Sequence, residues 1–381
     1  MPQKEPKARF KTPLSKILTE YLKMHPMNQL DLAEYLNIGE RTLRRWKNGE
    51  EVLTDAQELK RIAELLNVEP ELLGVVSSVH LPLTLEQIDK ALAHVWTLVA
   101  NARNYEARVA GEKLVKDLRA QITKEDHELL VRLARTHHVT GYVTSLNTHT
   151  TEIHKAIAHF EQMAQIARIL HEDTLLNLAF TYHGDMLRRE GDTDEAITYL
   201  EAARDTTPLA DVAARGNAIQ LLGRAYVQRR DIDGFERALA EAERLVGEID
   251  AEQSSTNGLY CRGTVLEEYG RSYGTLGQMQ KALEYLDEAA TELPPTMRWK
   301  ILLMTSRAVT LVRGGEYQEG GELAIESAQL CRAHGNIRCL ERIYGVQRYL
   351  ERLSRDVGKI SGDIREALDG PLGHWEVPTQ G

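Results

Sequence analysis

Residues 29–50 read QLDLAEYLNIGERTLRRWKNGE and hold two short helical patterns, over 29–36 and 40–47. In each pattern the apolar residues recur at helical spacing, so that they gather on one face. The small side chain of Ala33 on that face permits close approach of the second helix. We therefore predict two crossed helices that pack through their apolar faces. The inward positions are Leu32, Ala33, Leu36, Ile38, Leu43 and Trp46.

The opposite face of the 40–47 segment is strongly basic. Arg41, Arg44 and Arg45 point outward if Leu43 and Trp46 point inward. Three guanidinium groups on so short a helix repel one another unless a polyanion neutralises them. Arginine also grips phosphates and reads guanine through paired hydrogen bonds in the major groove. The pattern therefore favours duplex DNA as a partner.

The distribution of charge along the whole chain also favours a polyanion as the partner of the N-terminal segment. Residues 1–48 carry 10 Lys and Arg against 5 Asp and Glu, whereas the remaining 333 residues carry 37 against 52. A basic head on a long acidic body is expected where only the head meets a polyanion. The leader over 1–11 contributes four of those bases, and we interpret it as a flexible basic arm.

The segment resembles the helix-turn-helix of the phage-repressor and Cro-like (XRE) family. Asn37 stands where the family turn usually has Gly, and Gly39 stands where Ser or Thr usually caps the second helix. Asn tolerates the left-handed conformation, whereas Gly provides no side-chain cap. The resemblance is specific because its positions span both helices and the turn after them. The matching residues are Gln29, Leu32, Ala33, Ile38, Trp46, Asn48 and Gly49.

Flanking helices complete the expected domain. Apolar periodicity predicts helices over 14–24 and 55–67, and Pro70 opens a further helical turn over 70–74. Thr54, with Gln57 three residues on, forms a capping-box pattern at the start of the 55–67 helix.

The resemblance implies that some residues contact bases and others contact phosphates, because such a motif places its second helix in the major groove. Two alternatives stay open: the motif serves only as a packing unit, or it binds another protein. The residues implied to contact bases are Glu40, Arg41, Thr42 and Arg45. The residues suited to phosphate contact are Gln29, Arg44, Lys47 and Asn48.

The rest of the chain is repetitive. Gly184, Leu187, Gly191, Ala196, Leu200, Ala203 and Pro208 have counterparts at identical offsets in Gly270, Tyr273, Gly277, Ala282, Leu286, Ala289 and Pro294. The first Gly and the Ala twelve residues on suit two antiparallel helices that touch closely, and the second Gly suits the end of a helix. The pattern is similar to the tetratricopeptide repeat (TPR), a helical hairpin of about 34 residues. The expected hairpins cover 85–121, 125–170, 172–206, 210–247, 258–292 and 296–333, before a closing helix at 336–354.

Stacked TPR hairpins form a right-handed superhelix whose first helices line a concave surface. Mixed amides, arginines and carboxylates on that surface suit the backbone amides and termini of a peptide. The residues expected there as peptide-binding are Tyr182, Asp185, Arg188, Arg189, Asn217, Gln220, Arg224, Gln228, Glu267, Glu268 and Arg271.

We therefore expect an all-α protein: a five-helix repressor-type domain followed by a TPR superhelix. Its expected parts are the arm at 1–11, the DNA-binding domain at 12–76, a linker at 77–84, the TPR-like body at 85–355 and a flexible tail at 356–381.

Other classes of protein lack support in the sequence. Three dispersed cysteines fit neither a disulfide framework nor a zinc site, and they indicate a reducing, cytoplasmic setting. The first 30 residues lack a signal-peptide core, and no apolar run is long enough for a membrane span. Histidines between 127 and 159 are not spaced to converge on a metal, and nucleotide-binding and nucleophile motifs are missing. We expect no catalytic residue, no metal and no cofactor.

The layout resembles the peptide-responsive RRNPP regulators of Gram-positive bacteria. That resemblance implies a homodimer on a palindromic operator, with a short peptide or protein ligand in the superhelix that alters the separation of the two heads. One alternative is a TPR scaffold or adaptor whose head does not bind DNA. Another is a phosphatase-like regulator of a partner protein, but such relatives carry a plain helical bundle where residues 29–49 match the helix-turn-helix here.

Overall fold

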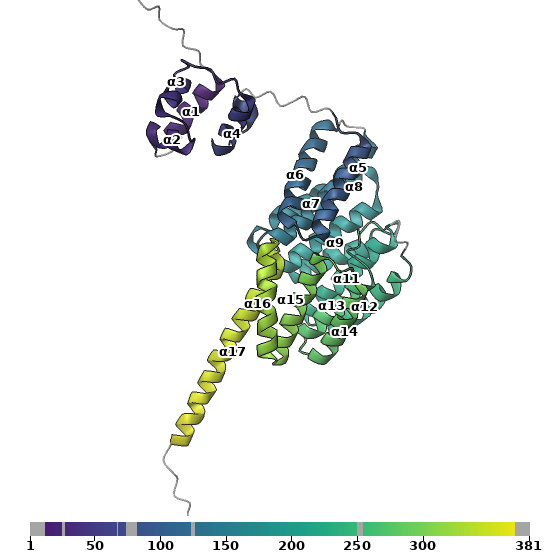
Figure 1. Ribbon diagram of the computed structural model, residues 1–381. Coiled ribbons are helices and arrows are strands. Elements are labelled where there is room, and N and C mark those ends of the chain that lie inside the picture. The colour runs from purple at the N-terminus through teal and green to yellow at the C-terminus, as the bar shows by residue number, and fades with distance from the viewer. Residues whose placement is uncertain are drawn as a thin grey trace, which may run out of the picture. The chain divides into compact units, whose positions relative to one another are not determined.

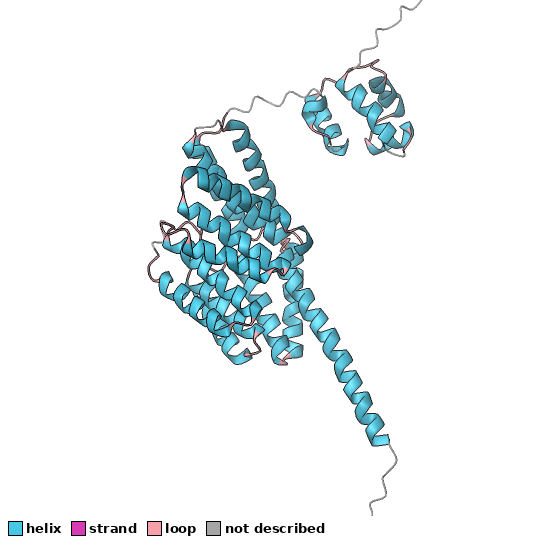
Figure 2. Ribbon diagram, turned by 180° about the vertical axis from the view of Figure 1, so that it is seen from behind, coloured by secondary structure: helices cyan, strands magenta, loops and turns pink. Residues whose placement is uncertain are grey.

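The computed structural model describes residues 12–24, 27–66, 68–73, 82–122, 126–249 and 254–369. Across these ranges the regular structure is entirely helical, as expected (Figure 2). The chain divides into two compact units, Met1–Pro82 and Leu83–Gly381. None of the helices in the described ranges combines the length and apolarity needed to traverse a bilayer.

The N-terminal unit is a small bundle with its own core. Leu18, Leu32, Leu36, Leu43 and Ile62 are completely buried there. The expected inward positions are thus confirmed, with Ile38 partly buried against the same cluster. Its elements are α1 (Pro13–Met24), α2 (Gln29–Tyr35), α3 (Glu40–Lys47), α4 (Ala56–Leu66) and the 3-10 helix η1 (Pro70–Leu73).

Local chemistry fixes the turn between α2 and α3. Asn28 accepts hydrogen bonds from two backbone amides at the start of α2, and Asp31 accepts one in return. Asn37 adopts the left-handed conformation at φ 53°, and Gly39 begins α3 without a side-chain cap.

The expected cap of α4 at Thr54 was wrong, because Asp55 accepts the backbone N–H groups of the first turn. A carboxylate is the stronger acceptor there.

The larger unit is a stack of six helical hairpins and a long last helix (Figure 1). Each hairpin packs its two helices on each other, and successive hairpins pack side by side. The hairpins are α5 (Leu85–Ala100) with α6 (Asn104–Gln121), α7 (His127–Asn147) with α8 (His154–Leu170), α9 (Asp173–Glu190) with α10 (Thr193–Asp205), α11 (Val212–Arg229) with α12 (Ile232–Val246), α13 (Arg262–Thr275) with α14 (Met279–Glu292), and α15 (Met297–Gly314) with α16 (Tyr317–Ala333).

The repeated glycines have the roles that their spacing indicated. A Cβ on Gly184 would lie 2.9 Å from Leu200 and 3.0 Å from the Ala196 carbonyl oxygen, so only glycine permits this approach. Gly270 makes the same close approach to the second helix of its own hairpin. Gly191 ends α9 at φ 101°, a left-handed conformation that favours glycine.

The two ends of the stack meet. The Asn104 side chain donates to the His334 carbonyl oxygen at 3.1 Å, and the Asn147 side chain donates to that of Gly335 at 3.0 Å. Thr150 donates its backbone N–H to the Glu341 carboxylate at 2.8 Å. Helices that are distant in sequence therefore surround one shared interior.

The last helix, α17, runs from Ile337 to Asp369. The expected tail from residue 356 was wrong for 356–369, where Val357, Ile360 and Ile364 continue the helical apolar period. Residues 370–381 of that tail, the arm at 1–11 and most of the linker at 77–84 lie outside the described residues.

Candidate nucleic-acid interface and ligand pocket

The outward face of α3 presents free positive charge. Leu43 and Trp46 anchor the helix in the core, being 0% and 6% exposed. Arg41 and Arg44 lie exposed on the other side, and within the described part of the chain neither has a hydrogen bond or an ion pair. Two solvated guanidinium groups are therefore available to an external anion.

Arg45 is held differently from its neighbours. Its Nη1 atom lies 2.9 Å from a carboxylate oxygen of Glu51, in the loop after α3. The two side chains are 44% and 39% exposed, so the pair contributes little, about 0–1 kcal/mol. Asn48 similarly donates to Glu50 at 3.1 Å. A polyanion can displace these loop carboxylates at small cost.

The other residues implied to contact DNA share the same region of the unit. Glu40 is exposed at the start of α3, and Thr42, Lys47 and Asn48 are half-buried along it and at its end. Gln29 is half-buried at the first position of α2. The structure thus brings the residues together on two consecutive helices.

Two adjoining cavities, of about 460 and 90 Å³, lie in the described part of the body, and a separate one of about 630 Å³ between α5, α7 and α9 is lined by none of the expected residues. Arg224, Arg271 and Arg338 line both of the adjoining cavities. All eleven residues expected to bind a peptide line one or the other. The larger of the two is lined by Arg188, Arg189, Arg224, Gln228, Glu268 and Arg271, and the smaller by Tyr182, Asp185, Asn217, Gln220, Arg224, Glu267 and Arg271.

A buried carboxylate organises the arginines between the cavities. Asp185 is 2% exposed and accepts hydrogen bonds from Arg188 at 2.8 Å, Arg338 at 3.1 Å and Arg224 at 3.2 Å. Burial by itself raises the pKa of Asp185, but the guanidinium groups of Arg188, Arg338 and Arg224 hold that pKa well below its ordinary value. Asp185 is therefore ionised at neutral pH and fixes side chains from α9, α11 and α17.

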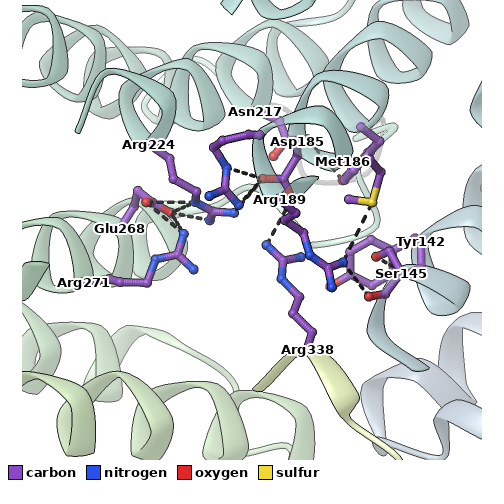
Figure 3. A network of polar contacts seen from close by, with 12 residues as sticks. Tyr142, Ser145, Asp185, Met186, Arg189, Asn217, Arg224, Glu268, Arg271 and Arg338 are labelled. Carbon is purple, nitrogen blue, oxygen red and sulfur yellow. Dashed lines mark hydrogen bonds and ion pairs between the residues drawn. The ribbon is translucent and has the colours of Figure 1, made fainter. Parts of the chain in front are cut away.

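Arg224 bridges to a second buried carboxylate (Figure 3). Its Nε atom donates to Glu268 at 2.9 Å, and Arg271 donates to the same carboxylate at 2.9 Å. Glu268 is 0% exposed. These contacts tie α11 to α13 in the wall of the larger cavity.

Several of the expected peptide-binding residues are engaged in the wall itself. The Tyr182 ring stacks on Phe160, and its hydroxyl accepts a hydrogen bond from Asn217 at 3.1 Å. Gln220 accepts one from Thr264 at 3.3 Å, and Glu267 accepts one from Ser306 at 2.6 Å. The polar side chains of the smaller cavity thus largely hydrogen-bond to one another, whereas donors without a partner line the larger one.

The contribution of α17 to the pocket was not predicted from the sequence. Arg338, Glu341 and Arg342 from its first two turns line the larger of the two adjoining cavities. Their spacing of three and four residues on one helix places them on one face, which was the signal that the sequence offered. Only the meeting of the two ends of the stack brings that face to the pocket.

The larger cavity has an excess of positive charge. Seven arginines line it, against Glu268, Glu341 and the adjacent Asp185. Like charges in so confined a space repel one another, because little solvent screens them. An anion in this cavity would reduce the repulsion.

Two of these arginines also carry donors without an acceptor. The buried Arg189 Nη2 and Arg342 Nη1 atoms have no hydrogen-bond partner among the described residues, and Glu341 lies 3.7 Å from the former. Burial, followed by the nearby charge of Arg338, lowers the pKa of Arg189 to about 10. A bound anion would therefore satisfy donors that the wall leaves open.

A histidine of α7 and one of α8 form a partly buried pair. The Nδ1 atoms of His137 and His159 lie 2.9 Å apart. Within the described ranges no group of three or more His, Cys, Asp or Glu is placed to hold a metal ion.

Comparison with known proteins adds to this geometry. The helix-turn-helix family model HTH_3 matches residues 18–73. No curated protein sequence matches the chain. Among solved structures, the apo form of the competence regulator ComR from Streptococcus vestibularis covers 80% of this chain and 99% of its own, at 15% identity and a TM-score of 0.39. A Podosopora anserina kinesin light chain structure with nearly identical TPR-like repeats covers 55% of this chain and 95% of its own, at 17% identity and a TM-score of 0.37.

The family match falls on the unit that holds α1 to α4 and η1, and it agrees with the capped turn and the exposed basic face found there. The hairpins of the second unit repeat the close glycine contacts that the TPR pattern requires. The chain is therefore an all-α protein with an XRE-type helix-turn-helix DNA-binding domain followed by a TPR-like helical body.

Proposed function

We propose that the protein is a sequence-specific DNA-binding transcriptional regulator controlled by a short anionic peptide. The observation that carries the DNA-binding part is the free basic face of α3 inside the matched helix-turn-helix. Arg41 and Arg44 are exposed and unpaired in the described part of the chain, as a phosphate- and base-contacting helix requires.

On duplex DNA the N-terminal part of α3 enters the major groove. Arg45 exchanges the Glu51 carboxylate for a base edge, and Arg44 contacts a phosphate. The proposed base contacts come from Glu40, Arg41, Thr42 and Arg45, and the proposed phosphate contacts from Gln29, Arg44, Lys47 and Asn48.

Charge and volume in the body support an anionic peptide as the ligand. A cavity of about 460 Å³ suits a few residues, and its arginine excess suits acidic side chains or a C-terminal carboxylate. Arg189 and Arg342 supply the donors that have no hydrogen-bond partner. The ligand would contact α9, α11, α13 and α17 together, so it favours whichever arrangement of these helices brings the arginines onto it.

The remaining parts of the proposal follow from this function. The protein acts in the cytoplasm, where DNA and imported peptides meet. A homodimer on a palindromic operator, with the peptide altering the separation of its heads, completes the regulatory scheme.

Selection of binding sites tests the DNA-binding part. The full chain, Arg41→Ala and Arg44→Ala are each used to select duplexes from a random-sequence pool. The proposal predicts one consensus for the unchanged chain and for Arg44→Ala, with weaker binding by the latter, and a relaxed base preference for Arg41→Ala. Lys60→Ala, on exposed α4 surface, is the matched control and should change neither. Failure to select any sequence would contradict the proposal and favour the scaffold alternative.

Calorimetry with peptide pools tests the ligand. Acidic pools with a free C-terminal carboxylate should release heat, whereas basic pools should not. Amidation of the C-terminus shows whether the carboxylate itself is bound, and inorganic phosphate controls for simple anion uptake. Arg342→Gln should abolish the heat while Arg307→Gln, outside the cavity, should not. Equal heat from both variants would contradict the assigned cavity.

A further inference from the structure

Two of the three cysteines lie together where α16 meets α17. Cys331 is in the last turn of α16 and Cys339 is in the first turn of α17, and both belong to one cluster of buried side chains. They are 0% and 3% exposed, and both are free thiols. The fold thus brings two thiols into one cluster of the body.

The turn between the two helices fixes the cysteines relative to each other. Asn336 donates its backbone N–H to the Cys331 carbonyl oxygen at 2.8 Å. Its side-chain oxygen accepts the backbone N–H of Cys339 at 3.0 Å. Gly335 supplies a left-handed residue to this turn at φ 61°. One asparagine therefore holds the backbones of both cysteines.

The two thiols differ in how readily they ionise. A hydrogen bond from the Cys331 thiol lowers the pKa of the Cys339 thiol, which burial by itself raises. The positive charges of Arg342 and Arg338 lower that pKa further. The hydrogen bond and burial both raise the pKa of Cys331. Cys339 is therefore the thiol that more readily becomes the nucleophilic thiolate.

The smaller cavity gives a small molecule access to Cys339. Cys339 lines this cavity of about 90 Å³, and Cys331 does not. That volume holds a molecule of a few heavy atoms, since one water occupies about 30 Å³ in the liquid. Arg298, Arg338 and Asn336 line the same cavity and carry N–H groups that can hydrogen-bond to peroxide oxygens.

Cys261 provides a comparison within the same chain. It is half-buried just before α13, in a cluster that contains no second cysteine. A free cysteine without a partner or an activating charge usually packs as a small apolar side chain. A cytoplasmic pair of neighbouring thiols is instead typical of transient, redox-sensing disulfides.

We propose that Cys331 and Cys339 form a site of reversible oxidation by small hydroperoxides. The Cys339 thiolate attacks one peroxide oxygen and the O–O bond breaks, which leaves a sulfenic acid on Cys339 and an alkoxide that takes a proton from water. The Cys331 sulfur then attacks the Cys339 sulfur, and the sulfenic hydroxyl group leaves as water with the Cys331 proton. Two thiols lose two electrons in total, and one hydroperoxide is reduced to an alcohol and water.

The resulting disulfide would join α16 to the first turn of α17. That turn also carries Arg338, which donates to Asp185 at 3.1 Å and lines both adjoining cavities. Oxidation therefore acts on the end of the body that closes the stack. The reaction needs neither DNA nor peptide, so its test is independent of the proposed regulatory function.

Peptide mapping of the full chain after exposure to hydrogen peroxide tests the site. Trypsin separates the two cysteines, so the expected disulfide links peptide 314–332 to peptide 339–342. The linked pair should form with one peroxide consumed per chain, and dithiothreitol should reverse it. The Cys339 thiol should be lost about tenfold or more faster than the Cys261 thiol. Loss of both thiols at the same rate, or disulfides that involve Cys261 instead, would overturn the proposal.

Three variants, each shown to be folded by urea unfolding, test the roles of the two thiols. Cys331→Ser lacks the resolving thiol, so peroxide should leave a sulfenic acid on Cys339 that dimedone labels when it is added with urea. Cys339→Ser should leave Cys331 reduced, whereas the matched control Cys261→Ser should form the disulfide at the unchanged rate. Fast oxidation of Cys331 in Cys339→Ser, or no dimedone label on Cys339 in Cys331→Ser, would contradict the assigned roles. If a variant does not fold, the rates of the thiols in the unchanged chain still decide the proposal.

Discussion

Replacing Asp185 by Asn should weaken the body and, in the same variant, strengthen its response to anions. Asp185 is the shared acceptor of Arg188, Arg224 and Arg338, from three different helices. Asn keeps the shape of the side chain but removes the negative charge. The substitution therefore leaves three guanidinium groups beside a neutral amide.

The structure sets the size of the effect. Asp185 is 2% exposed, and its arginine partners are between 11% and 18% exposed, so solvent replaces little of the missing interaction. Removing one partner of a buried ion pair costs about 3–5 kcal/mol. That is a large part of the roughly 5–15 kcal/mol by which a domain is usually stable.

Urea unfolding of the full chain, followed by far-ultraviolet circular dichroism, measures the destabilisation. Asp205→Asn is the matched control, because Asp205 makes an exposed ion pair with Arg204 and should cost about 1 kcal/mol or less. Repeating the titrations with sulfate in place of chloride, at equal ionic strength, measures the anion response. Sulfate should recover more stability in Asp185→Asn than in the unchanged chain, because the cavity has gained one net positive charge.

Two results would refute this reasoning. A destabilisation no larger than that of Asp205→Asn would mean that the buried carboxylate does not hold the arginines together. An identical sulfate response in variant and unchanged chain would mean that the cavity does not bind anions through its excess charge.

Three further predictions concern other parts of the molecule. Glu51→Gln should tighten DNA binding by up to about fivefold in fluorescence anisotropy, since freeing the Arg45 guanidinium recovers at most about 1 kcal/mol; unchanged or weaker binding would count against the proposed exchange. Burial lowers the pKa of His137 and of His138 to about 3, from an ordinary 6.5, so the unfolded chain takes up protons first as the pH falls below 6.5. The free energy of unfolding should therefore be highest above pH 6.5 and should decrease by about 3 kcal/mol by about pH 5.5. A urea midpoint that does not change over this pH range would contradict this prediction. Gly184→Ala should destabilise by about 1–3 kcal/mol in thermal unfolding because its Cβ meets the neighbouring helix, while Gly358→Ala in open space should not, and equal effects would refute the close-packing argument.

The features that sequence predicted well are those encoded over short distances. The spacing from Gly184 to Ala196 lies within one hairpin and predicts that its two helices pack closely. Asn37 likewise marks the turn between two adjacent helices. The helices of the helix-turn-helix and the hairpins were therefore placed nearly to their ends. The cap of α4 differed by one residue because Thr54 and Asp55 are both good capping residues, and the Asp55 carboxylate, the stronger acceptor, takes the backbone N–H groups of the first turn.

Features set by closure of the whole stack were not predictable in the same way. Arg338 and Glu341 reach the pocket because the start and the end of the body meet, which no local spacing encodes. The pairing of Arg45 with Glu51 likewise depends on the path of a loop. The helix over 356–369 was missed because its glycines suggested a flexible segment, although the apolar period continues through it.

The salt dependence of DNA binding tests the central claim most directly. The full chain and the double variant Arg41→Ala, Arg44→Ala are titrated onto labelled duplex DNA at several salt concentrations. We expect salt-sensitive binding whose log–log slope becomes shallower by about 1 for each phosphate that the variant no longer neutralises. Binding that is insensitive to salt, or a variant with the same affinity and slope as the unchanged chain, would contradict the claim that the basic face of α3 binds DNA.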